Sequence, residues 1–297
     1  MKKKLLCLLL LYSFNVSAQK IDQRLQLQIE NLVKDFDGEI GVYVHDLSNN
    51  KIVELNADTI FPTASIVKIP ILLGIMHKIE TGALQYHQRL KYSDSLFYNE
   101  GDDILSAFKN GSDIELSKVM MLMLTISDNC ASLWLQGLAG GGSTINQLLD
   151  STGFKYTRVN SRTIGREANR TLYGWGQTTA REIATIMERI VNNDILSKES
   201  DEKMLRLLGR QYWDEEALSQ VPPGVFTADK NGAVDASRDE VVYVNGKHPY
   251  IFSIFTKNIK DQGWETSNEA WVLTRKLSAL LWKYYNPSSQ WKGPIIN

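Results

Sequence analysis

Residues Phe61–Leu84, FPTASIVKIPILLGIMHKIETGAL, decide how the rest of the chain is organised. The run IPILLGIM carries no charge, which predicts a buried helix that opens at Ser65 and ends at Thr81-Gly82. Ser65 and Lys68 are three residues apart and therefore lie on the same helical face. Partial desolvation would lower the pKa of this lysine and let its amine act as a base toward the neighbouring hydroxyl.

The same two residues also allow a plainer interpretation, in which Ser65 caps the helix and Lys68 extends to solvent. The pattern S-x-x-K occurs by chance about once in a chain of this length. Alone it therefore indicates little, and other motifs must decide between the two interpretations.

The first 18 residues, MKKKLLCLLLLYSFNVSA, have the features of a secretory signal peptide. Three lysines precede an apolar run, and Val16-Ser17-Ala18 offers small residues where a signal peptidase cleaves. A membrane anchor is the alternative, but the run is much shorter than the ~20 residues needed to span a bilayer. Cys7 lies inside the apolar run and not after it, which disfavours a lipoprotein. We expect an exported protein, periplasmic or secreted, with no membrane attachment after cleavage.

The composition of the remaining chain excludes several classes of protein. Cleavage of the signal peptide would remove three lysines and no acidic residue, so that 30 of the 33 Lys and Arg residues remain against 34 Asp and Glu residues. This balance disfavours nucleic-acid binding. Cys130 is then the one remaining cysteine, so stability must come from a core and not from an internal disulfide, and Cys130 is interpreted as a small buried hydrophobe. The four histidines are scattered without ligand spacing, and we expect no metal and no other cofactor.

Strand patterns occur at the two ends of the chain, with helical patterns between them. The runs GEIGVYVHDLS and KIVELNAD, residues 38–58, predict a hairpin around Asn49-Asn50. Residues 225–257 predict three more strands, with Asn245-Gly246 as a two-residue turn. Residues 21–36 and 267–285 predict amphipathic helices.

The middle of the chain reads mainly as helices, with three exceptions. Residues 90–99 are polar and predict irregular structure, and residues 101–116 predict a short helix followed by a turn at Gly111. Residues 154–178 lack periodicity and predict a long loop of the kind that is usually functional or mobile.

We therefore predict an α/β fold, with an antiparallel sheet that is flanked by helices and built from both chain ends, and with an inserted all-helical lobe. The mature chain, residues 19–297, forms one domain. Its α/β lobe comprises about 19–64 and 215–297, and its helical lobe about 65–214. The junction of the two lobes is a natural place for a cleft.

Three short motifs follow one another at fitting places: Ser65-Ile66-Val67-Lys68 at a helix start, Ser127-Asp128-Asn129 at a helix junction, and Lys230-Asn231-Gly232 within a late strand. Their order and setting resemble the S-x-x-K, S-D-N and K-T-G motifs of class A β-lactamases and penicillin-binding proteins. The resemblance covers most of residues 20–285. It implies a β-lactamase/transpeptidase-like fold and a serine acyl-enzyme mechanism on a small-molecule substrate, either a β-lactam or a D-Ala-D-Ala-type peptide.

Acyl transfer explains these residue types independently of the family, because it needs a nucleophile, a base, a proton route to the leaving nitrogen and donors for the oxyanion. Ser65 supplies the hydroxyl and Lys68 the base or relay. Ser127 can pass a proton toward the leaving nitrogen. Lys230 supplies positive charge for a substrate carboxylate, and Asn129 can hydrogen-bond a substrate amide.

The resemblance adds the oxyanion hole, which would be formed by the backbone N–H groups of Ser65 and Ala233. Gly232 suits close backbone approach by a ligand. Lys230 has a structural alternative, protection of an edge strand against aggregation. Asp128 is interpreted as a structural residue that ties down the helix junction.

Two positions depart from the family pattern. Asn231 stands where the motif has threonine, although its side chain can still hydrogen-bond a carboxylate. The family also carries a glutamate in a setting like R-x-E-x-x-x-N, which activates the water that releases the acyl group. Arg166-Glu167-Ala168-Asn169 offers Glu167 as the best candidate for that base, with spacing that does not match cleanly. The alternative is an exposed glutamate paired with Arg166 or Arg170.

The leading hypothesis is a periplasmic, monomeric class A β-lactamase-like serine hydrolase that acts through a Ser65 acyl-enzyme. The first alternative is a D,D-peptidase or penicillin-binding-type acyltransferase with slow or absent lactam turnover. A third hypothesis is a binding module that keeps the fold and has lost catalysis. The fate of the acyl ester distinguishes the first two.

Overall fold

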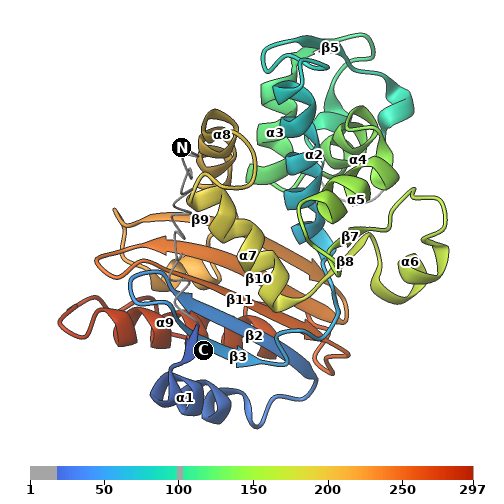
Figure 1. Ribbon diagram of the computed structural model, residues 1–297. Helices are drawn as coiled ribbons and strands as arrows, with labels where there is room; N and C mark the ends of the chain where they lie inside the picture. Colours follow the sequence, from blue (N-terminus) through green and yellow to red (C-terminus); the bar gives the residue numbers. More distant parts are fainter. Residues whose placement is uncertain (1–18, 99–102, 297) are drawn as a thin grey trace, which may run out of the picture.

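The computed structural model describes residues 19–98 and 103–296, and its centre is a six-stranded sheet (Figure 1). The strand order is β1-β3-β2-β11-β10-β9, so a strand from the start of the chain lies beside one from its end. Neighbouring strands are antiparallel except for the two-residue β1, which runs parallel to β3. The bounds are β1 Lys20–Ile21, β2 Glu39–Asp46, β3 Lys51–Leu55, β9 Phe226–Val234, β10 Ser237–Asn245 and β11 Tyr250–Lys257.

Helices cover both faces of this sheet, which confirms the predicted α/β class. Helices α1 (Gln23–Val33) and α9 (Glu269–Tyr285) and the turn η4 (Ala217–Gln220) share one hydrophobic core with one face. Helix α7 (Ala180–Val191) packs on the other face, against β2, β10 and β11. Side chains therefore alternate between two cores along each strand, and β10 is buried from Ser237 to Val244.

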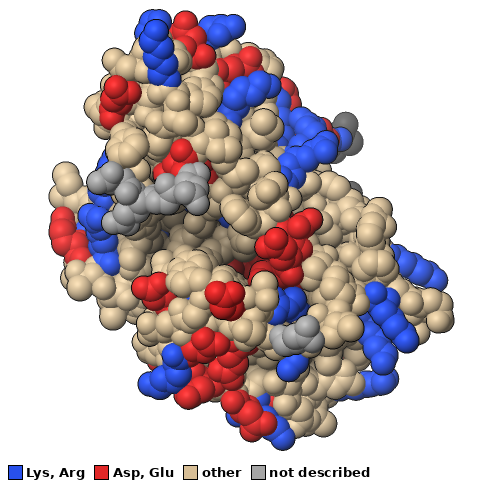
Figure 2. Space-filling view, turned by 180° about the vertical axis from the view of Figure 1, so that it is seen from behind, with Lys and Arg blue, Asp and Glu red and all other residues tan. Residues whose placement is uncertain are grey.

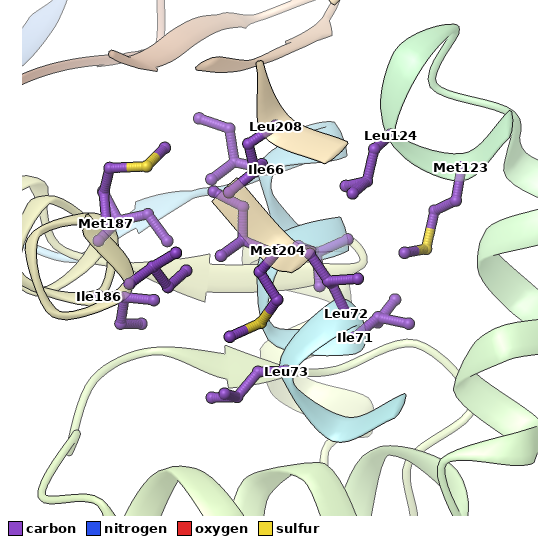
Figure 3. Close-up of a cluster of buried hydrophobic side chains, with 14 of the residues drawn as sticks. Ile66, Ile71, Leu72, Leu73, Met123, Leu124, Ile186, Met187, Met204 and Leu208 are labelled. Carbon is purple, nitrogen blue, oxygen red and sulfur yellow. The ribbon is translucent and has the colours of Figure 1, made fainter. Parts of the chain in front are cut away.

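Most of the remaining helices gather beyond the α7 face around α2 (Lys68–Glu80), which is buried from Lys68 to Met76 (Figure 1). Figure 3 shows Ile71, Leu72 and Leu73 of α2 surrounded by side chains from α3, α7 and α8. The uncharged run that predicted a buried helix thus forms the axis of the helical part. The helices around it are α3 Leu116–Thr125, α4 Asn129–Leu138, α5 Gly141–Ser151 and α8 Lys198–Leu208.

Residues 154–178 hold more regular structure than the long loop that the sequence predicted. They contain β7 (Arg158–Val159), α6 (Glu167–Tyr173) and β8 (Gly176–Thr178), and β8 pairs with both β7 and β4 (Phe61–Pro62). The prediction was wrong because elements of two to seven residues are too short to produce a periodic pattern.

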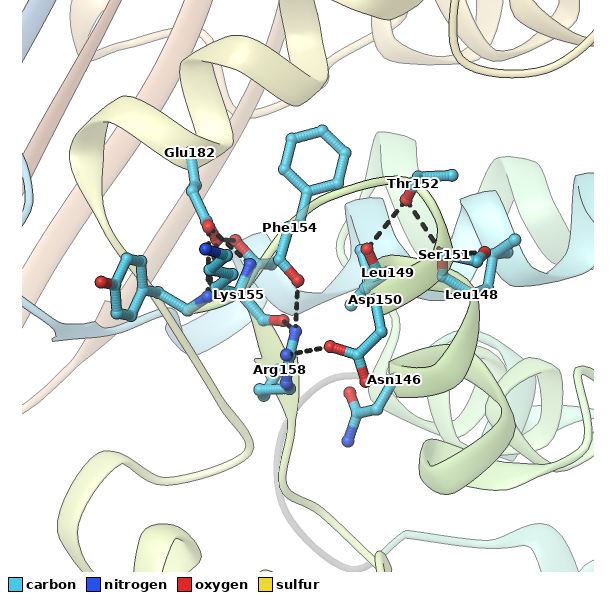
Figure 4. Close-up of polar contacts among 12 residues, drawn as sticks. Asn146, Leu148, Leu149, Asp150, Ser151, Thr152, Phe154, Lys155, Arg158 and Glu182 are labelled. Atoms are coloured by element: carbon cyan, nitrogen blue, oxygen red, sulfur yellow. Dashed lines mark hydrogen bonds and ion pairs between the residues drawn. The ribbon is translucent and has the colours of Figure 1, made fainter.

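Glu182 of α7 fixes the entry into this segment (Figure 4). Its carboxylate accepts hydrogen bonds from the backbone N–H groups of Lys155 and Thr157, both at 2.7 Å, and of Tyr156 at 3.0 Å. Arg158 then donates to the carbonyl of Phe154 at 2.8 Å. The segment is therefore anchored to the helix that packs on the main sheet.

Three smaller predictions also need correction. The β10–β11 connection is longer than a two-residue turn at Asn245-Gly246, because β10 ends at Asn245 and β11 begins at Tyr250. Residues 90–99 are not wholly irregular, since β5 (Arg89–Lys91) pairs with β6 (Asp113–Glu115) and η2 covers Asp94–Leu96. The short helix expected in residues 101–116 is a single 3-10 turn, η3, at Leu105–Ala107.

The expected signal peptide, residues 1–18, lies outside the described residues. Within the described part of the chain, no helix has the length and apolar character that a membrane crossing requires.

Candidate active site

Ser65 and Lys68 lie at the junction of two helical segments. Ser65 belongs to the 3-10 turn η1 (Ala64–Val67), and Lys68 is the first residue of α2. The expected helix therefore begins with a tighter turn, and Ala64 enters it with a left-handed φ of 43°. This geometry places the Lys68 Nζ 2.9 Å from the Ser65 Oγ.

Ser127, in the turn between α3 and α4, and Asn129, the first residue of α4, approach the same amine. The Lys68 Nζ lies 2.9 Å from the Ser127 Oγ and 2.9 Å from the Asn129 Oδ1, and it also donates to the Ser127 backbone carbonyl. Ser127 has a φ of 63°, in the left-handed region. The structure thus brings Ser65, Lys68, Ser127 and Asn129 together, although Lys68 and Ser127 are 59 positions apart in the sequence.

Two aspartates hold this turn by capping α4. The Asp128 carboxylate accepts from the Ala131 N–H at 2.7 Å and the Leu105 N–H at 2.9 Å. The Asp103 carboxylate accepts from the Asn129 N–H at 2.6 Å. Asp103 was missed by the sequence analysis, because no short pattern links it to a turn 26 residues away. Both carboxylates satisfy N–H groups that a helix start leaves unpaired.

Burial determines the proton affinity of the amine. Lys68 has no exposed surface. This burial lowers the pKa of Lys68 well below its usual value, and the charge of Lys230 lowers it further. The carboxylates of Asp103 and Asp128 oppose the shift. The amine can therefore lose its proton far more readily than a lysine in water, which a base toward Ser65 requires.

Lys230, Asn231 and Gly232 lie on β9, the edge strand of the main sheet. Lys230 is fully buried, which lowers its pKa, whereas Asp229 and Glu240 oppose that shift. Its Nζ donates to the Asn231 carbonyl at 2.8 Å and to the Asn231 Oδ1 at 2.9 Å. Asn231 is thus the residue through which this lysine is held at the strand edge.

Gly232 is required by the protein's own backbone. A Cβ at this position would lie 2.6 Å from the Thr63 carbonyl oxygen and 2.9 Å from the Ser65 nitrogen. Contacts this short do not occur between real Cβ atoms and backbone, so any other residue would push β9 away from η1. The sequence attributed the glycine to close approach by a ligand, whereas the structure shows close approach by the turn that carries Ser65.

The backbone of Ala233 points off the edge of the sheet. Its partner on β10 is Arg238, whose N–H donates to the Thr256 hydroxyl and whose carbonyl accepts from it, both toward β11. In an antiparallel ladder the N–H and C=O of one residue point to the same side. The Ala233 N–H therefore faces away from β10, and the Ser65 N–H, in the first turn of η1, has no intrahelical acceptor.

A cavity of about 460 Å³ opens in front of Ser65. Figure 2 shows the molecule hollowed between its helical part and its sheet. One wall comes from Leu172–Trp175 and the other from the end of β9. The lining residues are Pro62, Ala64, Ser65, Tyr98, Asn129, Leu172, Tyr173, Gly174, Trp175, Ala233, Val234, Ala236, Ser237, Lys257 and Asn258.

The structure does not bring Glu167 to this cavity. Glu167 is exposed at the start of α6, and its carboxylate accepts from the Gly165 N–H at 3.1 Å. The alternative interpretation paired this glutamate with Arg166 or Arg170, but Arg166 donates instead to Asn160 and Gln177. The placement of Glu167 thus gives it no contact with Ser65 or Lys68.

In the part of the chain that it describes, the structure gives no evidence for a cysteine nucleophile or for a metal ion at this site. Cys130 is buried, and burial raises the pKa of its thiol to about 11, which agrees with the prediction of a buried hydrophobe. Among the described residues, no group of three or more His, Cys, Asp or Glu side chains is arranged to hold a metal ion.

A comparison with known proteins shows which family this chain belongs to. The model of the β-lactamase enzyme family matches residues 24–285. The chain belongs to this family. The chain is 26% identical to β-lactamase VEB-1 of Pseudomonas aeruginosa, over 96% of its own length and 98% of the relative's.

Solved structures share the fold. PBP-A superposes with a TM-score of 0.79 at 24% identity, covering 91% of this chain and 98% of PBP-A. A mutant of PBP-A, in an acyl-enzyme complex with penicillin G, superposes with the same score over 90% of this chain and 98% of its own. A class A β-lactamase from Mycobacterium abscessus gives 0.76 at 20% identity, covering 88% and 99%. Together with the family model and the match to VEB-1, these structures confirm the predicted resemblance to class A serine β-lactamases.

The close contact at Gly232 generates a test. Gly232→Ala should slow covalent labelling of Ser65 by a fluorophosphonate by about 100-fold, because η1 and β9 must separate. It should also lower the free energy of unfolding by about 1–3 kcal/mol. Gly137→Ala is the matched control, since a Cβ there meets nothing within 4 Å. Labelling of Gly232→Ala at the wild-type rate would contradict the contact.

Proposed function

We propose that this member of the β-lactamase family is a serine hydrolase that opens β-lactam amides through an acyl-enzyme on Ser65. One observation carries the proposal: the Ser65 Oγ lies 2.9 Å from a fully buried amine whose pKa is lowered. A hydroxyl becomes a nucleophile when an adjacent base removes its proton, and the neutral form of Lys68 is that base. The names of the relatives, β-lactamases and PBP-A, support the same substrate class.

Acylation would proceed as follows. Lys68 takes the proton of the Ser65 hydroxyl while the oxygen bonds to the lactam carbonyl carbon. The N–H groups of Ser65 and Ala233 stabilise the oxyanion. The C–N bond then breaks, and the nitrogen receives a proton from the Ser127 hydroxyl, which Lys68 replenishes. This relay is supported by the 2.9 Å distance between the Lys68 Nζ and the Ser127 Oγ.

Substrate groups around the reacting bond would meet the remaining residues. Lys230 supplies positive charge for a substrate carboxylate, together with the side chain of Asn231. Gly232 lets this strand lie close to Ser65. Asn129 would hydrogen-bond the amide of the acyl side chain, because it lines the cavity.

Release of the acyl group is the step on which the two candidate functions differ. By microscopic reversibility, Lys68 can activate a water for hydrolysis as it activated Ser65. The second candidate is a D,D-peptidase or penicillin-binding-type acyltransferase that holds the acyl group for a long time. The placement of Glu167, exposed and bonded to Gly165, is the observation that favours this candidate over rapid hydrolysis.

We also propose the setting in which this chemistry takes place. Residues 1–18 direct export to the periplasm or the medium and are removed. Residues 19–297 form one catalytic domain and act as a monomer on a small molecule, a β-lactam or a D-Ala-D-Ala-type peptide. The family's exported character supports this setting.

Hydrolysis of a chromogenic cephalosporin by residues 19–297 tests the leading proposal. The wild-type chain should hydrolyse it, and Ser65→Ala should lower kcat by at least about 1,000-fold, because the nucleophile is removed. Equal rates for the two proteins would contradict the proposal. Absence of both turnover and a penicillin adduct in the wild-type chain would support a binding module without catalysis.

The intact mass of the protein after exposure to benzylpenicillin tests the role of Glu167. We expect a Ser65 adduct whose lifetime changes by less than about twofold in Glu167→Gln, because this carboxylate does not reach the cavity. Glu199→Gln is a control at another exposed glutamate. An adduct that persists at least about tenfold longer in Glu167→Gln would make Glu167 the deacylating base.

A further inference from the structure

Tyr212 and Trp213 cross the end of α3 in the connection between α8 and β9. The Tyr212 N–H donates to the Thr125 carbonyl at 2.9 Å, and the Trp213 Nε1–H donates to the Ile126 carbonyl at 3.0 Å. These two carbonyls belong to the last residue of α3 and to the residue after it. A helix end leaves such carbonyls unpaired, so the two bonds act as an external cap.

The capped residues lead directly into Ser127. Ile126 is its neighbour, and Ser127 adopts its left-handed φ of 63° immediately afterwards. A residue other than glycine adopts this conformation only where its surroundings hold it. The indole bond at Ile126 therefore restrains the peptide that sets the direction of the Ser127 side chain toward Lys68.

The same connection reaches the third motif. The Asn231 side-chain amide donates to the Trp213 carbonyl at 3.5 Å, the outer limit of a hydrogen bond. Trp213 thus lies between the turn that carries Ser127 and the strand that carries Lys230. It connects two segments that approach the reacting bond from opposite lobes.

Burial does not explain the presence of an indole here. Trp213 is 44% exposed, and its ring packs edge-on against Tyr212, which is itself exposed. The feature that a phenyl ring could not supply is the N–H directed at Ile126.

We propose that Trp213 is a positioning residue for proton transfer through Ser127, and that its indole N–H orients the Ser127 hydroxyl toward the leaving nitrogen. This inference rests on the proposed function. A role in proton delivery should matter only where the leaving atom needs a proton. A lactam nitrogen must be protonated as the C–N bond breaks, whereas a thiolate leaves without a proton.

The test compares second-order acylation rate constants for two probes, benzylpenicillin and a phenylacetylglycine thioester, in one variant. Trp213→Phe keeps a ring and removes the N–H. We expect its acylation by benzylpenicillin to fall about tenfold and its acylation by the thioester to change less than about twofold. Trp264→Phe is the matched control, because Trp264 is also exposed and donates one indole bond, to Asp235 at 3.1 Å. Both constants of the control should stay at the wild-type value.

The ratio of the acylation rate constants for benzylpenicillin and the thioester distinguishes a loss of proton delivery from a general loss of folding. A general loss of folding would lower both constants of Trp213→Phe equally, and an unchanged ratio would overturn the inference. An equal fall in the ratio for Trp264→Phe would also overturn it, because the effect would not be specific to the bond at Ile126. A wild-type chain that neither probe acylates would instead refute the proposed function.

Discussion

The buried amine of Lys68 is the interaction on which the rest of the site depends. Four oxygen atoms lie within hydrogen-bond distance of it: the Ser65 Oγ, the Ser127 carbonyl and Oγ, and the Asn129 Oδ1. A buried amine without such partners would be strongly destabilising. The partners come from η1, from the turn before α4 and from the first residue of α4, so these segments must keep their places for the amine to be satisfied.

The two segments that surround Lys68 have an uncommon backbone conformation. Ala64 and Ser127 both adopt left-handed φ values, 43° and 63°, on either side of Lys68. Such conformations cost of order 1–3 kcal/mol each and persist where packing determines them. The apolar packing of α2, the caps at Asp103 and Asp128, and the contact of Gly232 with η1 provide that restraint. Several independent contacts therefore restrain the position of the site.

Much of this arrangement could be predicted from the sequence, and the reasons for the exceptions are physical. The uncharged run of α2 and the strands at both chain ends have strong local patterns, so the fold class followed from them. The motifs placed Ser65, Lys68, Ser127 and Lys230 at the right kinds of element. Asp103, Trp213 and the true reason for Gly232 depend on contacts between distant segments, which no local pattern encodes. Glu167 was the best candidate for the family's glutamate although its spacing did not match cleanly, and it lies at the start of α6, where its carboxylate accepts from Gly165.

The central claim is that the neutral amine of Lys68 removes the proton of Ser65. The most direct measurement is the pH dependence of the rate of Ser65 acylation by benzylpenicillin in the wild-type chain and in Lys68→Arg. The rate of the wild type should fall as pH decreases through a pKa well below 10.5, since protonation removes the base. In Lys68→Arg it should fall by about 10²–10⁴ at every pH, because guanidinium cannot give up its proton. Acylation of Lys68→Arg at the wild-type rate would contradict the claim.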